Sequence, residues 1–257
     1  MESAAQAARD YQRDYSRHFP GVLDEAYKTE QGRRLSAVLA EAGPFPAGAV
    51  ALDLGCSGGF STRELAARFA KVIGFDLDPH AVRFAQRQLP PQVLMLVADG
   101  LRLPLRPASV AAILCSQIYE HVPDPERLMR EMERALAPGG VICFGATNKW
   151  IVIEPHYRLP FLSWLPRRWA DAYVRRARGL DRYYERLKSR RQLRRLCAGF
   201  EIEDFTLRMV RDPERYHCRD LVGPFAAIAR APLWLLRLLL PLFPSYVWIL
   251  RQPRPPS

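Results

Sequence analysis

The sequence has few of the features that mark secreted or membrane-spanning proteins. Its five cysteines are odd in number and widely spaced, and no Cys-x-x-Cys pair occurs, which argues against a disulfide framework and a structural zinc site. The first nineteen residues contain no apolar core, so no signal peptide is expected. Arg237 and Pro241 interrupt the apolar stretch at 232–244, whose uninterrupted part is too short to span the ~30 Å hydrocarbon of a bilayer. A cytoplasmic protein with reduced thiols is predicted.

Acidic residues are scarce in one segment only. The chain has a formal net charge of +11, and residues 157–195 hold 13 of its 38 basic residues but 3 of its 27 acidic ones. The excess charge therefore reflects a partner or a location more than the fold. With 257 residues, 49% of them hydrophobic, the chain is long enough for one large globular domain.

Short apolar runs alternate with amphipathic stretches, which is typical of a parallel sheet covered by helices on both faces. The expected strands are residues 50–54, 71–75, 93–97, 110–114, 141–144, 199–207 and 246–250. Helices are expected after the capping-box pattern Ser61–Glu64, over residues 79–89, and after Asp124, which precedes a proline. The pattern predicts a doubly wound α/β fold.

The domain organisation follows from these elements. Residues 1–48 are expected to form a helical cap, and residues 49–257 the main domain. Within the main domain, 149–198 is expected to be a basic, aromatic-rich helical insertion and 221–244 an apolar helical segment. In the cap, three aromatic rings recur every four residues, either as a packing stripe or to close over a bound ligand. They are Tyr11, Tyr15 and Phe19.

The most informative run is the glycine loop at 52–59, Leu-Asp-Leu-Gly-Cys-Ser-Gly-Gly, between the first expected strand and helix. In open α/β sheets, ligands bind outside the carboxyl ends of the strands, where glycines allow close approach to the backbone. The loop matches one of the three glycines of the dinucleotide pattern G-x-G-x-x-G, because Ser57 and Phe60 occupy the other two positions. It fits D-x-G-x-x-x-G instead, with Asp53, Gly55 and Gly59.

Further matches follow in order along the chain. Asp76 ends the second strand 17 residues beyond Gly59, near the spacing of a ribose-binding acid. Asp99 and Gly100 end the third strand, Ser116 and Gln117 follow the fourth, and Leu-Ala-Pro-Gly-Gly at 136–140 precedes the fifth. With these motifs the sequence resembles class I S-adenosylmethionine-dependent methyltransferases, in particular the type 11-like enzymes that act on small molecules.

The resemblance implies a Rossmann-like seven-stranded sheet, mostly parallel with an antiparallel last strand, N-terminal helices and a helical insertion after strand 5. It also implies an enzyme that binds S-adenosylmethionine, with Asp76 on the ribose hydroxyls and Asp99 against the adenine amine. The cofactor-binding residues implied are Asp53, Gly55, Cys56, Ser57, Gly59, Asp76, Leu77, Asp99, Gly100, Ser116 and Gln117.

Two positions depart from the family pattern. Ser57 stands where the family commonly has glycine, so a small hydroxyl must fit beside the cofactor. The run Gln-Ile-Tyr-Glu-His at 117–121 resembles the Glu-x-x-Glu-His run of quinone O-methyltransferases, where acidic residues can hold a divalent metal. Because Gln117 replaces the first acid and hard cations prefer charged oxygen ligands, no metal is expected. Glu120 and His121 are expected to shape the start of the next helix.

The acceptor side of the site has few candidates for a base. His156 lies in the expected loop after the fifth strand and can titrate near neutrality, so it is the first candidate for taking a proton from an acceptor hydroxyl. His121 is the second candidate and Tyr119 the third. Each of these residues also has a purely structural interpretation, as a hydrogen-bonding or packing residue.

The expected acceptor is a small, apolar or lipid-linked molecule, with O-methylation slightly favoured. Methylases of nucleic-acid bases usually carry Asn or Asp-Pro-Pro-aromatic where this chain has Ser-Gln-Ile-Tyr at 116–119, so nucleic acid is disfavoured. Tryptophans and arginines interleave in the insertion, which suits the anionic inner face of a membrane as well as a helical lid. The alternatives are an RNA-directed methyltransferase that uses the basic insertion, and a non-catalytic cofactor-binding protein.

Overall fold

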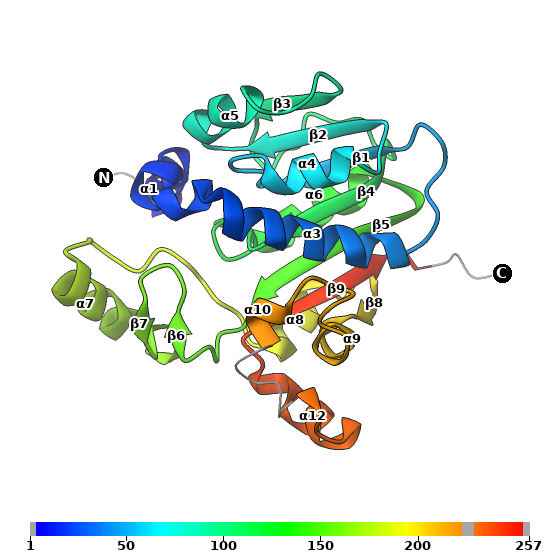
Figure 1. The fold of residues 1–257 in the computed structure, drawn as a ribbon. Helices are drawn as coiled ribbons and strands as arrows, with labels where there is room; N and C mark the ends of the chain where they lie inside the picture. Colours follow the sequence, from blue (N-terminus) through cyan, green and yellow to red (C-terminus); the bar gives the residue numbers. More distant parts are fainter. Residues whose placement is uncertain (1–3, 223–228, 254–257) are drawn as a thin grey trace.

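A seven-stranded sheet forms the centre of the computed structural model, which describes residues 4–222 and 229–253 (Figure 1). The strands lie in the order β3-β2-β1-β4-β5-β9-β8. Their bounds are β1 Val50–Leu54, β2 Lys71–Asp76, β3 Val93–Val97, β4 Val110–Ser116, β5 Leu136–Thr147, β8 Glu201–Asp204 and β9 Ser245–Arg251. Neighbouring strands from β3 to β5 are parallel, whereas β9 is antiparallel to both β5 and β8. The predicted doubly wound sheet with an antiparallel last strand is confirmed.

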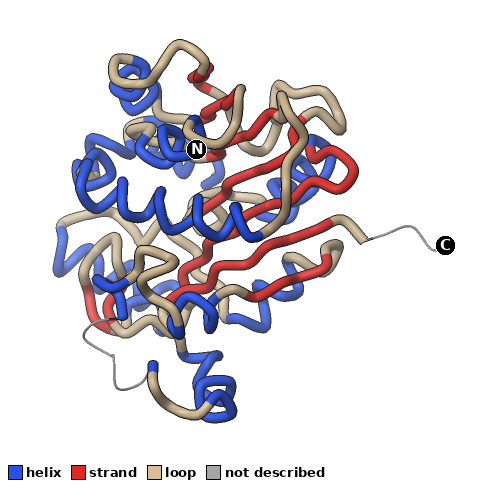
Figure 2. The backbone as a smooth tube through the Cα atoms, turned by 45° about the vertical axis from the view of Figure 1, so that its right-hand side comes forward, coloured by secondary structure: helices blue, strands red, loops and turns tan. Residues whose placement is uncertain are grey.

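Helices cover both faces of the sheet, because successive strand residues point to opposite sides. In β1, Ala51 packs with α3, α4 and α9, whereas the next residue, Leu52, packs with α6 and α8 on the other face. The bounds of these helices are α3 Glu25–Glu41, α4 Phe60–Ala66, α5 Pro79–Gln86, α6 Pro125–Ala135, α8 Arg190–Leu196 and α9 Thr206–Arg211. Figure 2 shows the helices flanking the strands. The carboxyl ends of the parallel strands therefore form one open edge of a three-layer sandwich.

Some predicted boundaries are wrong for local reasons. The strand expected at 199–207 ends at Asp204, whose side chain accepts the N–H of Thr206 (3.0 Å), and Thr206 begins α9. The capping box expected at Ser61 does not form, because α4 already begins at Phe60 after Gly59, which has a left-handed φ of 79°. The helix expected to reach residue 89 ends at Gln86. The fifth strand begins at Leu136, five residues before the expected start.

The insertion after β5 is only partly helical. Its first part is a hairpin of β6 (Ile153–Glu154) and β7 (Leu159–Pro160), and α7 (Arg167–Arg178) follows. The hairpin and α7 share a small apolar core of their own, which includes Leu162 and Val174. In Figure 1 this unit projects from the sheet edge where the parallel strands end. The insertion is thus placed to cover a site at that edge.

The N-terminal cap consists of α1 (Ala4–Arg13), α2 (Tyr15–His18), a 3-10 helix and α3. Figure 1 shows α1 at the same edge of the sheet, above the insertion. The predicted apolar segment at 221–244 is described in part, because residues 223–228 lie outside the described residues; α12 (Leu233–Leu239) forms its later part. Within the described residues, no helix combines the length and hydropathy needed to cross a membrane.

Candidate cofactor and acceptor site

The glycine loop joins β1 to α4 at the carboxyl edge of the sheet. The N–H groups of Gly55 and Cys56 both donate to the carbonyl of Phe75 at 2.7 and 3.0 Å, which fixes the loop against β2. Ser57 has a φ of 46°, in the left-handed region that favours glycine. Its serine side chain is accommodated, and its N–H points to the end of β2. The loop therefore presents backbone at the place where a ligand would approach.

Asp76 receives that N–H. Its Oδ2 accepts the N–H of Ser57 at 2.8 Å, and its Oδ1 accepts the N–H of Asp78 at 2.9 Å. Burial raises the pKa of Asp76, and these backbone hydrogen bonds counteract that rise. Each carboxylate oxygen can accept more than one hydrogen bond, so Asp76 keeps acceptor capacity for a ligand while it orients the loop.

Asp53 faces the pocket beneath the glycine loop. It is buried, and its Oδ2 accepts the hydroxyl hydrogen of Thr62 at 2.7 Å. Burial raises the pKa of Asp53 to about 7, although the hydrogen bond from Thr62 opposes the rise. The same pocket is lined by Lys28, by the glycine loop and by Ser116 at the end of β4. Acidic, basic and backbone groups thus meet in one polar pocket.

Asp99 follows β3 at the next position along the edge. Its Oδ1 accepts the N–H of Leu101 at 2.9 Å, and its Oδ2 forms an ion pair of 3.1 Å with Arg9 of α1. The N-terminal cap therefore contacts the acid that the sequence assigns to the adenine end of the cofactor. At the end of β4, the hydroxyl of Thr147 donates to the side-chain oxygen of Gln117.

Two imidazoles lie beyond the ends of β4 and β5. His156 follows β6, and its Nδ1 is 2.6 Å from Oε1 of Glu154. The other oxygen of Glu154 accepts the N–H groups of His156 and Tyr157, both at 2.8 Å. The ring of His121 lies 4.9 Å from that of His156 at an interplanar angle of 87°. Its Nδ1 is 3.6 Å from Oε1 of Glu185, a residue of the insertion.

Burial and the surrounding charges separate the pKa values of these groups. Burial lowers the pKa of His156, but the hydrogen bond to Glu154 and the nearby carboxylates outweigh it and raise the pKa to about 9. The pKa of His121 lies well below its ordinary value because of burial and the positive charge of His156. Burial raises the pKa of Glu120 to about 7. The carboxylates around His156 therefore move its pKa above the near-neutral value expected of a histidine.

Aromatic rings of the cap close over this cluster. Tyr15 lies against His121 with ring centroids 5.0 Å apart, and Phe19 lies 6.2 Å from His156. Tyr11 stacks on Tyr184 of the insertion at 3.9 Å. The cap and the insertion thus meet directly above the two imidazoles. The rings therefore form a packing stripe over the imidazoles, and closure of one of them over a bound ligand stays a prediction.

Solved structures of methyltransferases share this fold. An S-adenosylmethionine-dependent methyltransferase from Mesorhizobium loti is 20% identical, with a TM-score of 0.55 over 84% of this chain and 96% of that one. A phosphoethanolamine N-methyltransferase from Haemonchus contortus, solved with S-adenosylhomocysteine, is 19% identical, with a TM-score of 0.57 over 94% of this chain and 60% of that one.

Residues 52–144, which contain the glycine loop and the acids that end β2 and β3, match the sequence model of a family described as a methyltransferase domain. Residues 52–144 therefore form a methyltransferase domain. A ubiquinone biosynthesis O-methyltransferase from Idiomarina loihiensis is 33% identical over 132 residues, which are 45% of this chain and 51% of that relative. The chain spans about half the length of the curated relatives that it matches.

Within the methyltransferase domain, the predicted cofactor residues gather at one edge of the sheet, and their role stays a prediction. They come from the carboxyl ends of β1, β2 and β4 and from the loops after β1, β2, β3 and β4. Cys56 is buried, with a pKa that burial raises well above its ordinary value, so it contributes as a packing residue and through its backbone. Leu77 and Gly100 directly follow Asp76 and Asp99 at the strand ends.

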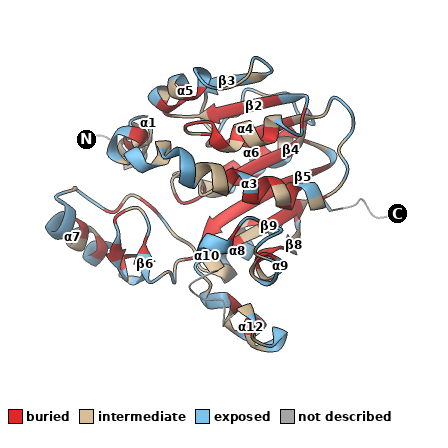
Figure 3. Ribbon diagram, viewed as in Figure 1, coloured by how far each residue is buried: buried red, intermediate tan, exposed pale blue. Residues whose placement is uncertain are grey.

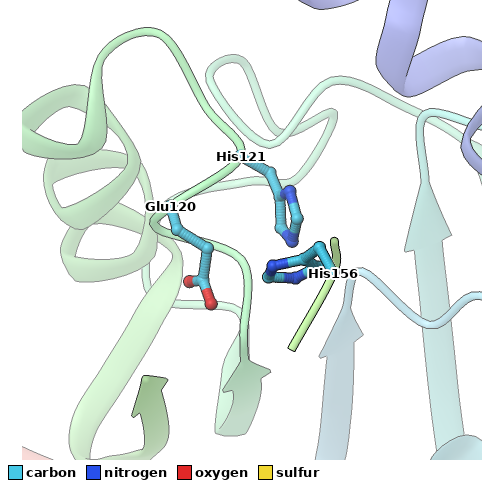
Figure 4. A group of neighbouring side chains, drawn as sticks. All are labelled: Glu120, His121 and His156. Carbon is cyan, nitrogen blue, oxygen red and sulfur yellow. The ribbon is translucent and has the colours of Figure 1, made fainter. Parts of the chain in front are cut away.

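Two expectations for residues near the candidate acceptor site differ from the structure. Tyr119 lies in the core, where its hydroxyl donates to the carbonyl of Thr147 (2.7 Å) and accepts the N–H of Lys188 (2.9 Å). It is therefore a structural residue in this arrangement. Glu120 and His121 do not form the start of the next helix, which begins at Pro125 after Asp124. They face His156 instead, as Figure 4 shows.

Two residues of the site, Lys28 and Glu185, escape sequence analysis, because they lie in segments that the glycine-loop motif does not reach. Glu154 can be expected from the sequence to orient the imidazole, because it lies two residues before His156, a spacing that allows a local side-chain hydrogen bond. Glu154 and Glu185 are fully buried, and only their placement against the imidazoles distinguishes them from other acids of the insertion.

Proposed function

We propose that this protein transfers the methyl group of S-adenosylmethionine to a hydroxyl of a small, apolar or lipid-linked acceptor. The observation that carries the proposal is the hydrogen bond between His156 and the buried Glu154, at the same sheet edge as the glycine loop. A hydroxyl acceptor must lose a proton when it is methylated, and this pair is built to accept one. The name of the O-methyltransferase relative supports oxygen as the methylated atom.

The cofactor supplies an activated methyl group, and the protein holds it in place. Asp76 is oriented to accept hydrogen bonds from the ribose hydroxyls, because its oxygens already lie against the glycine loop. Asp99 accepts a hydrogen bond from the adenine amine in competition with Arg9 of α1. Cofactor binding therefore loosens the contact between α1 and the sheet edge. Alignment of the acceptor with the methyl group can lower the barrier by ~7–11 kcal/mol.

His156 takes the proton of the acceptor in this proposal. One oxygen of Glu154 accepts from Nδ1–H of the imidazole, so that Nε2 is the free nitrogen, and the other oxygen accepts the backbone N–H groups of His156 and Tyr157. A base whose pKa is about 9 is stronger than an ordinary imidazole and suits a weakly acidic hydroxyl. His121, whose pKa is lowered, is the weaker base and the second candidate.

The acceptor is apolar because of what surrounds the imidazoles. Tyr15 and Phe19 lie over His121 and His156, and aromatic rings favour a ring or chain of low polarity. The same rings must move for an acceptor to enter, because both imidazoles are nearly covered. The cap is thus the element that opens and closes over the acceptor.

We propose that the reaction needs no divalent metal. Glu120, His121 and His156 offer ligand atoms within 4.8 Å of one another, close enough to share an ion (Figure 4). The carboxamide of Gln117, in place of an acid, leaves one charged oxygen fewer for a hard cation.

We also propose that the protein is cytoplasmic and peripheral on the inner face of the membrane. Trp150, Phe161 and Trp164 form an exposed aromatic cluster on the insertion, with ring centroids 5.7 and 5.0 Å apart. Trp169 on α7 and Trp234 on α12 are 69% and 67% exposed. Figure 3 shows exposed stretches on both helices. Exposed tryptophans with flanking arginines suit an anionic lipid surface.

The function is tested by supplying the protein with methyl-labelled S-adenosylmethionine and either a lipid extract or an RNA extract. The proposal predicts label in the lipid fraction, with the product stable to conditions that cleave amines selectively. Label in RNA would favour the RNA-directed alternative, in which the basic segment at 157–195 would contact the phosphates of the RNA. Cofactor binding without transfer to either extract would favour a non-catalytic role.

A further inference from the structure

The side chain of Lys28 reaches the cofactor pocket from outside the sheet. Lys28 lies in the first turns of α3, which begins after Asp24, whose side chain accepts the N–H of Tyr27 at 3.1 Å. It lines the same pocket as Asp53, the glycine loop and Ser116. The N-terminal cap therefore contributes a cation to a pocket whose other walls come from the ends of β1 and β4.

The ammonium group of Lys28 has little to neutralise it. Its Nζ donates to the side-chain oxygen of Gln31 at 3.2 Å. In the part of the chain that the structure describes, no carboxylate lies within ion-pair distance of it. Burial lowers the pKa of Lys28, while the charge of Asp53 raises it. An ammonium has three donors, so Lys28 can bind another acceptor in this pocket.

The other cations of α3 are paired, which sets Lys28 apart. Arg33 contacts Glu30 at 2.7 Å, and Arg34 contacts Asp220 at 2.9 Å. A partly buried charge without a counter-ion is costly, and proteins usually provide one from within the chain or from a ligand. Because Lys28 faces the glycine loop, the missing counter-ion is most simply a group of the molecule that binds there.

We propose that Lys28 binds the carboxylate of the methionine part of S-adenosylmethionine. The amino-acid end of this cofactor carries one carboxylate and one ammonium. The pocket offers an opposite pair, since Lys28 and Asp53 both line it. This assignment adds a residue from the cap to the cofactor site and rests on cofactor binding, not on the identity of the acceptor.

The test compares two cofactors that differ only in the carboxylate. Calorimetry measures the binding of S-adenosylmethionine and of decarboxylated S-adenosylmethionine to the wild type, to Lys28→Met and to Arg33→Met. Lys28→Met should reduce the affinity for S-adenosylmethionine roughly ten- to hundredfold, which is the usual contribution of a hydrogen bond to a charged group. It should leave the decarboxylated compound unaffected. Arg33→Met, which removes a cation from the same helix, should bind both as the wild type does.

Three results would overturn the proposal. The first is that Lys28→Met binds S-adenosylmethionine with the affinity of the wild type. The second is that its affinities for both compounds fall equally, which would mean that Lys28 only supports the fold. A rise in the KM for the acceptor alone would assign Lys28 to the acceptor. If Lys28→Met does not fold, as judged by its melting temperature, Lys28→Gln takes its place. A wild type that binds neither compound would contradict cofactor binding itself.

Discussion

Nδ1 of His156 lies 2.6 Å from Oε1 of Glu154, and the second oxygen of the same carboxylate accepts the N–H groups of His156 and Tyr157. Glu154 is fully buried, and among the described residues its carboxylate is hydrogen-bonded to His156 and Tyr157, which lie between β6 and β7. The carboxylate therefore sets both the direction of the imidazole and its affinity for a proton. The predictions below on acid–base chemistry follow from this pair.

Turnover should rise with pH up to about 9. The unprotonated imidazole is the form that accepts a proton, and the raised pKa of His156 makes this form scarce at neutral pH and abundant above about 9. A pH profile of kcat with a saturating acceptor measures it. Glu154→Gln removes the hydrogen-bonded charge that raises the pKa, so its inflection should move to lower pH. A profile that is flat between pH 6 and 9, or one that Glu154→Gln does not move, would contradict this role.

Asp76→Ala should weaken the binding of S-adenosylmethionine strongly while the protein stays folded. The substitution removes the carboxylate predicted to accept from two ribose hydroxyls, and charged hydrogen bonds of this kind are worth about 1.5–3 kcal/mol each. It also removes the acceptor of the Ser57 N–H, which orients the glycine loop. Calorimetry gives the affinity, and the same substitution at the exposed Asp181 is the control. Unchanged affinity would refute the assignment of Asp76.

Activity should not depend on a divalent metal. A chelator should leave turnover unchanged once an acceptor is known, because Gln117 stands where an acid could have supplied a charged oxygen to a hard cation. The experiment can contradict the prediction, because Glu120, His121 and His156 lie close enough together to bind an ion. Loss of activity with a chelator and its return with magnesium would overturn the prediction.

The protein should sediment with anionic liposomes at low salt. Trp169 on α7 is among the most exposed aromatic residues, so Trp169→Ala should reduce binding, whereas Tyr27→Ala on α3 should not. Binding should weaken as salt increases, because exposed charges are screened over ~10 Å at 0.1 M. If the wild type stays in the supernatant at low salt, the insertion is a lid without a membrane role.

Much of the fold could be predicted because local patterns determine it. The alternation of apolar runs and amphipathic stretches placed the strands from β1 to β5, and parallel strands bring their carboxyl ends to one edge. That rule alone gathers Asp53, Asp76 and Asp99 beside the glycine loop. Where prediction failed, a single side chain decided the boundary, as when Asp204 ends β8 by accepting the N–H of Thr206.

The acceptor side could not be predicted in the same way. His121 and Glu185 are 64 residues apart, and no periodic pattern links them. Their contact depends on how the insertion folds back over the sheet edge, which tertiary packing decides. The pKa of His156 likewise depends on three carboxylates that arrive from different segments. The sequence could name the two histidines, but not which of them is the stronger base.

The most direct test of the account is the turnover of His156→Ala with the acceptor found in the lipid fraction. The exposed His80→Ala is the control for removal of a histidine. Because general-base catalysis is typically worth ~10²–10⁴ in rate, turnover should fall by about that factor while the affinity for S-adenosylmethionine stays unchanged. If His156→Ala keeps more than about a tenth of wild-type turnover, which is a smaller loss than that range allows, His156 is not the base.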